Sequence, residues 1–400
     1  MAKLNLNPDA PMLEQDERGL PDLPFLLLTV MLVVIGVIML FSASYARAYA
    51  DEGNSAYYFV RQGGFAAAGL LCMWLISRVN YQVWRVFSLP ILAVSIVFLM
   101  LVPIMGSTGG GAKRWIYLGF FSFQPSEVAK VGVVLSFASM MSAWRDRMHD
   151  YRFGVLPFVG ILGVIAVLLY MEPHLSATII IVLTGGVMMF FGGTDKKWII
   201  GLILAGAALV AIYLLTKGYS GDRIKAWLDP YAYADDEGYQ IVQSEYAIGS
   251  GGLTGLGFGK SRQKYLYLPE EHNDYIFAIV CEELGFVGAA VVVLLFLLML
   301  LRGYWIAMHA RDRFGSLLVC GMVTLLGLQV FLNIGVVSNL LPSTGISLPF
   351  FSYGGTALLV NLAQMGMILA VSRQNDNRTI AKRKKTKGTK KRKKAGGGNE

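Results

Sequence analysis

One stretch of the chain places ionisable side chains directly before a long apolar run. It reads LPEEHNDYIFAIVCEELGFVG, residues 268–288. Residues 270–274 form its acidic head, and the apolar run that follows them ends near Leu301. That run is long enough to cross a bilayer, and titratable groups are costly near lipid. Glu270, Glu271 and Asp274 are therefore functional candidates, although acids at a helix N-terminus are also favoured by the helix dipole alone.

A carboxylate at this place could act as a base. Glycosyl transfer or hydrolysis needs one carboxylate as base and a cationic partner for the leaving group. Six basic residues are expected on the same side of the membrane: Lys113, Arg114, Arg223, Lys225, Arg262 and Lys264. Acids with such neighbours suit a lipid-linked phosphate substrate. A proton relay through His272 is a weaker alternative, because no serine or cysteine is known to lie near it.

The composition is that of a membrane protein. Of 400 residues, 55% are hydrophobic and only 15% are charged, whereas about 25% is usual in soluble domains. Apolar runs predict an all-α polytopic protein with about ten transmembrane helices. We expect spans near 25–45, 57–77, 86–105, 126–143, 154–170, 175–193, 198–216, 275–301, 314–335 and 353–372.

Basic residues predict the orientation and the domain limits. The positive-inside rule favours both termini in the cytoplasm, with a large outer loop, 217–274, between the seventh and eighth helices. Residues 1–24 are expected to form a cytoplasmic lead, 25–373 the membrane domain and 374–400 a disordered basic tail. From Arg373 to Glu400 there are twelve Lys or Arg and two acids, so the net charge of +9 belongs to the tail. It does not indicate a nucleic-acid-binding face.

Charged residues inside predicted spans need protein partners. Glu127 and Lys130 are three residues apart on one helical face, so they can pair or face a cavity. Glu282 and Glu283 lie about two turns into the eighth span, and a structural hydrogen bond is favoured there over catalysis. The three cysteines have neither zinc-site nor disulfide-framework spacing.

Two outer segments have unusual composition. The run GSGGLTGLGFG, residues 249–259, approaches a phosphate-loop pattern, but Thr254 stands where the first glycine is needed. We interpret it as a tight turn packed on the membrane mouth, whose N–H groups could cradle a pyrophosphate. Residues 336–352 carry no charge and are broken by Pro and Gly. We expect them to fold back as a re-entrant wall of the site.

Three motifs together resemble the SEDS family (shape, elongation, division and sporulation) of bacterial cell-wall synthesis. They are GAKRWIYLGFFSFQPSEVAK at 111–130, the stretch 238–288 that ends in the acidic head, and NIGVVSNLLPSTGISLPFFSYGG at 333–355. The resemblance covers about residues 25–373. The end of the first helix and the SRQKYLYLPE run resemble the division and sporulation (FtsW-like) branch more than the elongation (RodA-like) branch.

The resemblance implies a glycosyltransferase that polymerises lipid II into peptidoglycan at the outer face of the cytoplasmic membrane, at the septum during division. The family's essential acid lies in an H-T-D-F pattern, which matches residues 272–275 and implies that Asp274 is the catalytic base. Asn273 and Tyr275 depart from that pattern. So does Glu172-Pro173-His174, where many members have an acid after the proline.

The same resemblance suggests the remaining assignments. Arg114, with Lys113 or Lys130, would stabilise the leaving undecaprenyl pyrophosphate while Asp274 deprotonates the acceptor 4-hydroxyl, with inversion in a single displacement. Candidate substrate contacts are Lys113, Arg114, Lys130, Glu127, Glu270, Gln243, Ser244 and Ser352. Supporting structural positions are Glu282, Glu283, Pro349, Gly354 and Gly355. No cofactor is certain; a divalent cation, Mg²⁺ or Mn²⁺, is an open alternative, because the sequence shows no closed ligand set.

Expected partners are lipid II, a class B penicillin-binding protein and other divisome proteins, with no nucleic acid. Two other functions stay open. A lipid II flippase would place its key charges near the bilayer midplane and often shows internal repeats, whereas these charges gather at the outer mouth. A non-catalytic scaffold for the penicillin-binding protein would tolerate loss of Asp274.

Overall fold

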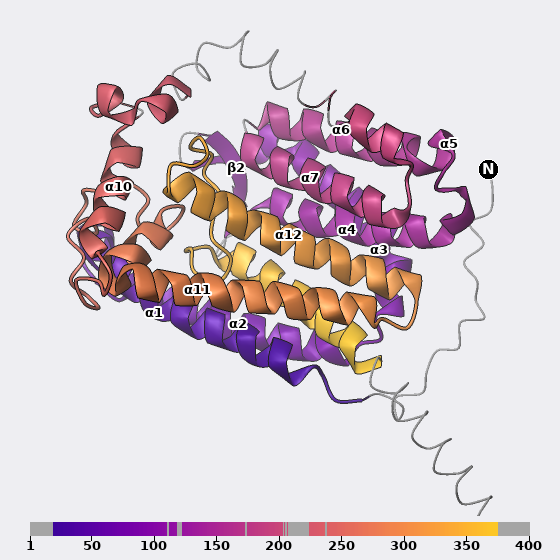
Figure 1. The fold of residues 1–400 in the computed structure, drawn as a ribbon, viewed down its shortest axis with the longest axis horizontal. Helices are drawn as coiled ribbons and strands as arrows, with labels where there is room; N and C mark the ends of the chain where they lie inside the picture. Colours follow the sequence, from indigo (N-terminus) through magenta and orange to yellow (C-terminus); the bar gives the residue numbers. More distant parts are fainter. Residues whose placement is uncertain are drawn as a thin grey trace, which may run out of the picture.

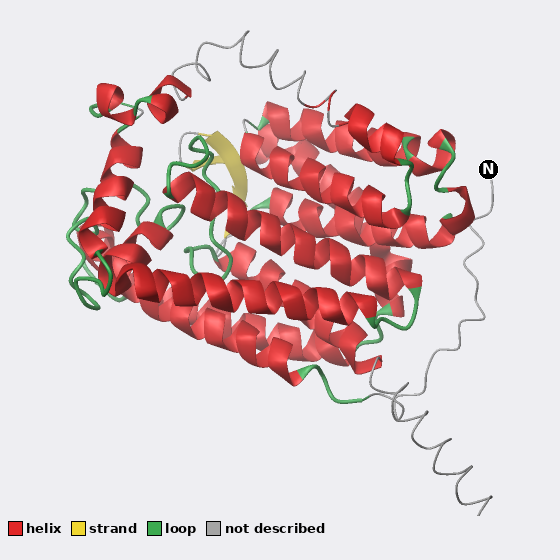
Figure 2. Ribbon diagram, viewed as in Figure 1, coloured by secondary structure: helices red, strands yellow, loops and turns green. Residues whose placement is uncertain are grey.

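The computed structural model describes residues 19–109, 112–117, 122–172, 174–202, 204, 206, 224–236 and 238–374. Most of this part is helical, and the long helices run side by side (Figures 1 and 2). Nine of the described helices are long and apolar enough to cross a membrane. The chain is therefore a multi-pass membrane protein, and the all-α prediction is confirmed.

The elements follow one another in a simple order. They are α1 (Leu23–Glu52), α2 (Tyr57–Arg78), α3 (Gln82–Met105), β1 (Ser107–Gly109), β2 (Ala112–Tyr117), β3 (Ser122–Phe123), α4 (Pro125–Ala143), η2 (Arg145–Arg147), α5 (Tyr151–Gly154), α6 (Leu156–Met171), α7 (Leu175–Gly192), η3 (Pro230–Tyr233), α10 (Tyr239–Gly251), α11 (Ile276–Met308), α12 (Arg313–Val337) and a last helix, Gly355–Gln374.

These helices match nine of the predicted spans, but several ends differ. The helix α1 continues to Glu52 and α11 to Met308, beyond the predicted ends near 45 and 301. Hydropathy marks where side chains meet lipid, whereas a helix ends only where its backbone hydrogen bonds stop. The predicted span 198–216 lies mostly outside the described residues, as do most of the lead 1–24 and nearly all of the tail 374–400.

The helices α4 and α12 form the centre of the bundle. Both are buried along most of their length, and α12 packs against α4, α7 and α11 (Figure 1). The helices α2, α3 and α11 instead leave most of their apolar side chains uncovered by protein. A helix that is apolar all round belongs in a core or a membrane. We therefore place lipid against the outer helices and polar chemistry between the inner ones.

Capped helix starts join the bundle at the end opposite the acidic head. Asp22 accepts a hydrogen bond from the Phe25 N–H at 3.1 Å and pairs with Arg302 of α11 at 2.7 Å. Asp312 caps α12 through the Gly315 N–H at 3.2 Å and accepts from the Tyr81 hydroxyl at 2.5 Å. An N-cap carboxylate satisfies an otherwise unpaired helix N–H. Here each cap also ties two helices together.

A small antiparallel sheet, in the order β1-β2-β3, fills the connection between α3 and α4 (Figure 2). Its register pairs Thr108 with Lys113 and Ile116 with Phe123. The strand β2 contacts both α3 and α4. This sheet was not predicted from sequence, and it fixes where the two basic residues of β2 point.

The segment between α12 and the last helix folds back, as predicted. It has no regular structure from Ser338 to Gly354, and its backbone φ is positive at Asn339, Gly345 and Phe350. The Tyr353 N–H donates to the carbonyl of His272 at 2.9 Å. The fold-back segment, as we call residues 338–354, therefore lies against the acidic head.

Candidate active site at the start of α11

Asp274 lies in the turn directly before α11 and is partly buried. Burial raises the pKa of its carboxyl to about 7; the charge of Glu270 raises the pKa further, and Arg114 lowers it. A carboxylic acid usually titrates near 4. A pKa near neutrality makes the carboxylate a stronger proton acceptor while a large fraction remains ionised, which suits a general base.

The backbone around Asp274 is held by side chains distant in sequence. Asn333 of α12 donates from Nδ2 to the carbonyl of Asp274 at 2.7 Å and to that of Ile346 at 2.6 Å. Ser352 Oγ donates to the carbonyl of Asn273 at 2.7 Å. One amide group therefore joins the acidic head to the fold-back segment, and Ser352 joins them a second time.

Ser352 consequently has a different role from the predicted substrate contact. Its hydroxyl also accepts from the Leu348 N–H at 2.7 Å, so its donor and an acceptor site are used within the protein. Gln62 of α2 adds two more bonds, donating to the Ser352 carbonyl at 3.1 Å and accepting from the Gly354 N–H at 3.2 Å. These contacts make Ser352 a holder of the acidic head.

Close approach disfavours a side chain at two glycines, Gly345 in the fold-back segment and Gly355 at the start of the last helix. A Cβ at Gly355 would lie 2.4 Å from the Phe65 ring. Gly345 has φ 62°, and a Cβ there would lie 3.1 Å from Asp274 Oδ2. The second distance shows that bare backbone lines one side of the carboxylate.

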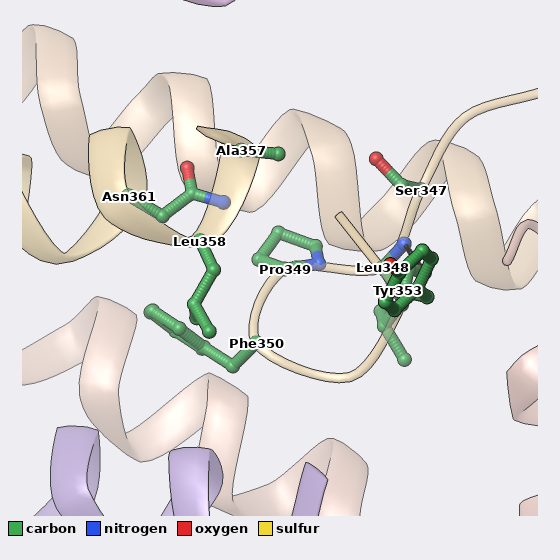
Figure 3. Close-up of a pocket in the computed structure, with 9 residues that line it drawn as sticks. Ser347, Leu348, Pro349, Phe350, Tyr353, Ala357, Leu358 and Asn361 are labelled. Atoms are coloured by element: carbon green, nitrogen blue, oxygen red, sulfur yellow. Dashed lines mark hydrogen bonds between the residues drawn. The ribbon is translucent and has the colours of Figure 1, made fainter. Parts of the chain in front are cut away.

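A small cavity lies between the fold-back segment and the last helix, with Pro349 and Asn361 among the residues that line it (Figure 3). Its volume is about 10 Å³, which is room for about one water molecule. Leu348, Phe350 and Leu358 supply much of its apolar lining (Figure 3). It is too small for a sugar, so we do not assign it to substrate.

The basic candidates do not all lie together. Lys113 and Arg114 are neighbours on β2, and alternate residues of a strand point to opposite faces. Lys113 is exposed, whereas Arg114 is partly buried and close enough to Asp274 to lower its pKa. Arg114 is therefore the member of this pair that acts on Asp274, and substrate contact by Lys113 stays a prediction.

Lys130 and Glu127 form the ion pair that their spacing predicts. Their side chains meet at 2.8 Å near the start of α4, and both are buried. Arg114 and Lys130 both lie close enough to His174 to lower its pKa. Arg114 thus lies near Asp274 on one side and near the α6–α7 turn on the other.

The glycine-rich run packs as predicted but does not offer all its amides to a ligand. The N–H groups of Leu256 and Gly257 donate to the carbonyls of Glu282 and Glu283, at 2.9 and 3.0 Å. Those carbonyls are available because α11 breaks at Gly285, where φ is 67°. These two N–H groups are therefore not available to bind a pyrophosphate, because they already donate to backbone carbonyls.

Glu282 and Glu283 hold the loop between α10 and α11. Glu282 accepts from the Ser261 hydroxyl and from the Arg262 N–H at 2.9 Å. Glu283 pairs with Lys264 at 2.9 Å and accepts from Ser42 of α1 at 2.7 Å. Both carboxylates are buried and fully engaged, which agrees with the structural interpretation.

The other candidates lie further from the carboxylate or are already engaged. Ser244 is fully buried and donates to the Val337 carbonyl at 2.7 Å, so it joins α10 to α12 and is not open to substrate. Gln243 is partly buried on α10. Glu270 is exposed and accepts from Asn273 Nδ2 at 2.6 Å.

His272 is part of an aromatic stack. Its ring lies 4.9 Å from the Tyr58 ring, stacked, and 6.0 Å from that of Tyr353. Burial lowers its pKa to about 4. No hydrogen bond between His272 and Asp274 occurs among the described residues. A neutral, stacked imidazole gives the acidic head a rigid wall.

Sequence reasoning missed Asn333 and Gln62. Both are amide side chains within apolar spans, and polar groups in such spans usually face the protein interior and serve a function. That signal was available, but their partners were not, because each lies far away along the chain. A divalent cation is not supported by side chains: within the described ranges, no three His, Cys, Asp or Glu residues come together as ligands.

Comparison with known proteins places this arrangement in a family. The profile of the family described as "Cell cycle protein", which spans FtsW, RodA and SpoVE, matches residues 23–377. The chain belongs to the FtsW/RodA/SpoVE family. The SEDS resemblance that the three motifs predicted is thereby confirmed.

Sequence relatives of this family cover nearly the whole membrane domain. "Probable peptidoglycan glycosyltransferase FtsW" of Geobacter sulfurreducens is 37% identical over 353 residues, covering 88% of this chain and 95% of the relative. "Stage V sporulation protein E" of Bacillus subtilis is 39% identical over 355 residues, with 88% and 97% covered. Both names belong to the division and sporulation branch, as predicted.

Solved structures agree on the fold. A chain from "a peptidoglycan synthase complex", described for its coordination of polymerization and crosslinking, matches with a TM-score of 0.75 at 27% identity, covering 89% of this chain and 98% of that one. The rod shape determining protein RodA of Thermus thermophilus gives 0.67 at 26% identity, with 89% and 97% covered. The FtsW/RodA/SpoVE architecture therefore extends over the described bundle.

Proposed function

We propose that this FtsW/RodA/SpoVE protein is a peptidoglycan glycosyltransferase that polymerises lipid II, with Asp274 as general base. One arrangement carries the proposal: the Asp274 carboxyl lies in the turn before α11, with the bare backbone of Gly345 on one side and Arg114 close enough to lower its pKa. A base at this place would take the proton from the acceptor 4-hydroxyl. The relative named as a probable peptidoglycan glycosyltransferase supports the same chemistry.

The reaction balances without a redox step. The acceptor oxygen forms a bond to the anomeric carbon of the donor sugar as the bond to the diphosphate oxygen breaks. Asp274 takes the hydroxyl proton, and the lipid diphosphate leaves with the bonding electron pair. Arg114 is the cation beside Asp274 that would stabilise that anion. A single displacement of this kind inverts the anomeric configuration.

The cellular setting follows from the proposed substrate. The acidic head would face outward with both termini in the cytoplasm, as the basic inner loops favour. A class B penicillin-binding protein would crosslink the product, which the synthase complex among the structural relatives supports. Division or sporulation would be the process, given the names of the two relatives.

The test is polymerisation of lipid II by the purified full-length protein with its cognate penicillin-binding partner. Asp274→Asn should abolish glycan polymer, while Asp235→Asn, at an exposed acid of the same outer loop, should not. Equal polymer from the wild type and Asp274→Asn would refute the role of Asp274. Lipid II exposure in vesicles by a chain that forms no polymer would favour a flippase instead.

A further inference from the structure

The turn between α6 and α7 contains buried polar atoms that the proposed reaction does not yet use. Glu172 is 2% exposed and His174 is 7% exposed. Within the described part of the chain, both carboxyl oxygens of Glu172 lack a hydrogen-bond partner, and so does the Nδ1 atom of His174. Buried polar atoms are nearly always paired, so unpaired ones indicate a water or ligand that belongs there.

These atoms gather around the cations of the candidate site. Arg114 lies close enough to both Glu172 and His174 to alter their pKa, and Lys130 acts on His174 as well. Lys130 pairs with Glu127 at 2.8 Å on α4, and both side chains are buried. Arg114 therefore lies close to buried polar or charged groups from α4, from the turn between α6 and α7 and from the turn before α11.

The start of α7 adds a further preference for an anion. His174 is its N-cap residue, its side chain makes no capping bond, and the helix runs from Leu175 to Gly192. Unpaired N–H groups at a helix N-terminus favour negative charge. Ser176 ties this helix start to the fold-back segment by donating to the carbonyl of Thr344.

We propose that the α6–α7 turn, with Arg114 and Lys130, binds the diphosphate of the lipid-linked sugar, and that Glu172 and His174 each donate a hydrogen bond to it as neutral groups. This inference rests on the proposed function for the identity of the lipid diphosphate. Two cations and two neutral donors match an anion with many acceptor oxygens. A carboxylate at either position would instead repel it.

The protonation of both residues agrees with this role. Burial, against the opposing effect of Arg114, raises the pKa of Glu172 to about 8, so its carboxyl keeps the proton at neutral pH. Burial, with Arg114 and Lys130, lowers the pKa of His174 to about 3, so its ring is neutral. The charged groups around them are Arg114 from β2, Glu127 and Lys130 from α4, and Asp274 before α11.

The experiment measures binding of undecaprenyl diphosphate, with undecaprenyl monophosphate for comparison, to the full chain in nanodiscs. Glu172→Leu and His174→Leu should each weaken diphosphate binding about tenfold, the size of one hydrogen bond to a charged group. Glu172→Gln should bind as the wild type does, because an amide also donates. Glu52→Leu and His309→Leu, at exposed residues, are matched controls.

The pH dependence separates this role from a structural one. Wild-type affinity should fall as the pH rises through about 8, because Glu172 then loses its proton, and Glu172→Gln should lose that fall. Unchanged affinity in both leucine variants, or the same alkaline fall in Glu172→Gln, would overturn the inference. If the wild type binds in this way but never polymerises, the proposed function fails and the diphosphate site stands.

Discussion

Gly345 and Asp274 approach each other so closely that a Cβ on Gly345 would lie 3.1 Å from Asp274 Oδ2, tight enough that the carboxylate must shift. Gly345→Ala should therefore displace the carboxylate and reduce lipid II polymerisation. The positive φ of 62° adds a stability cost of about 1–2 kcal/mol for an L-residue. Polymerisation rates and thermal unfolding in detergent measure the two effects.

A control for Gly345→Ala exists in the outer loop. Gly259 also has positive φ, at 79°, but a Cβ there meets nothing within 4 Å. Gly259→Ala should thus lower the stability of the protein through the strained backbone but should leave polymerisation unchanged. If both variants lose activity equally, the contact with Asp274 has no special importance.

The pKa of Asp274 predicts an acid limit to activity. A base must be ionised, so the rate should fall as the pH drops through about 7. Glu270→Gln removes a charge that raises this pKa, and the limit should move to lower pH. Rate-against-pH profiles of wild type, Glu270→Gln and the exposed control Glu52→Gln test this; a limit that stays fixed in Glu270→Gln would contradict it.

The sequence predicted best those features that depend on nearby residues. Spacing showed that Glu127 and Lys130 could pair or face a cavity, and apolar runs predicted the helices. Position at the mouth of a span drew attention to Asp274. Each of these inferences needs only the local period of a helix and the cost of charge near lipid.

Features that depend on distant residues were missed. Lys113 and Arg114 point in opposite directions because they are neighbours on strand β2. The sequence between α3 and α4 did not predict this strand. The bonds of Ser352 to Asn273 and of Asn333 to Asp274 join residues 79 and 59 positions apart. No periodicity encodes such partners, so polar groups were recognised as candidates while their contacts were not.

The ion pair of Lys264 with Glu283 predicts a large effect on stability. Both side chains are buried, and Ser42 bonds to both. Lys264→Met leaves a buried carboxylate without its cation, which costs about 3–5 kcal/mol. Thermal unfolding should show this loss of stability in Lys264→Met and a partial recovery in the double variant Lys264→Met/Glu283→Gln. The control Lys260→Met, at an exposed lysine of the same loop, should change the unfolding temperature little. No recovery in the double variant would mean that lost packing causes the effect.

Asn333 is predicted to position the catalytic turn without touching substrate. Its Nδ2 bonds to the carbonyls of both Asp274 and Ile346, so Asn333→Leu leaves two carbonyls unsatisfied and frees the turn. The turnover rate for lipid II should fall at least about tenfold, with a smaller change in KM, because a misplaced base weakens the transition state more than substrate binding. Gln329→Leu, at a buried amide on the same helix, is the matched control. A rise in KM alone for Asn333→Leu would instead place Asn333 in substrate binding.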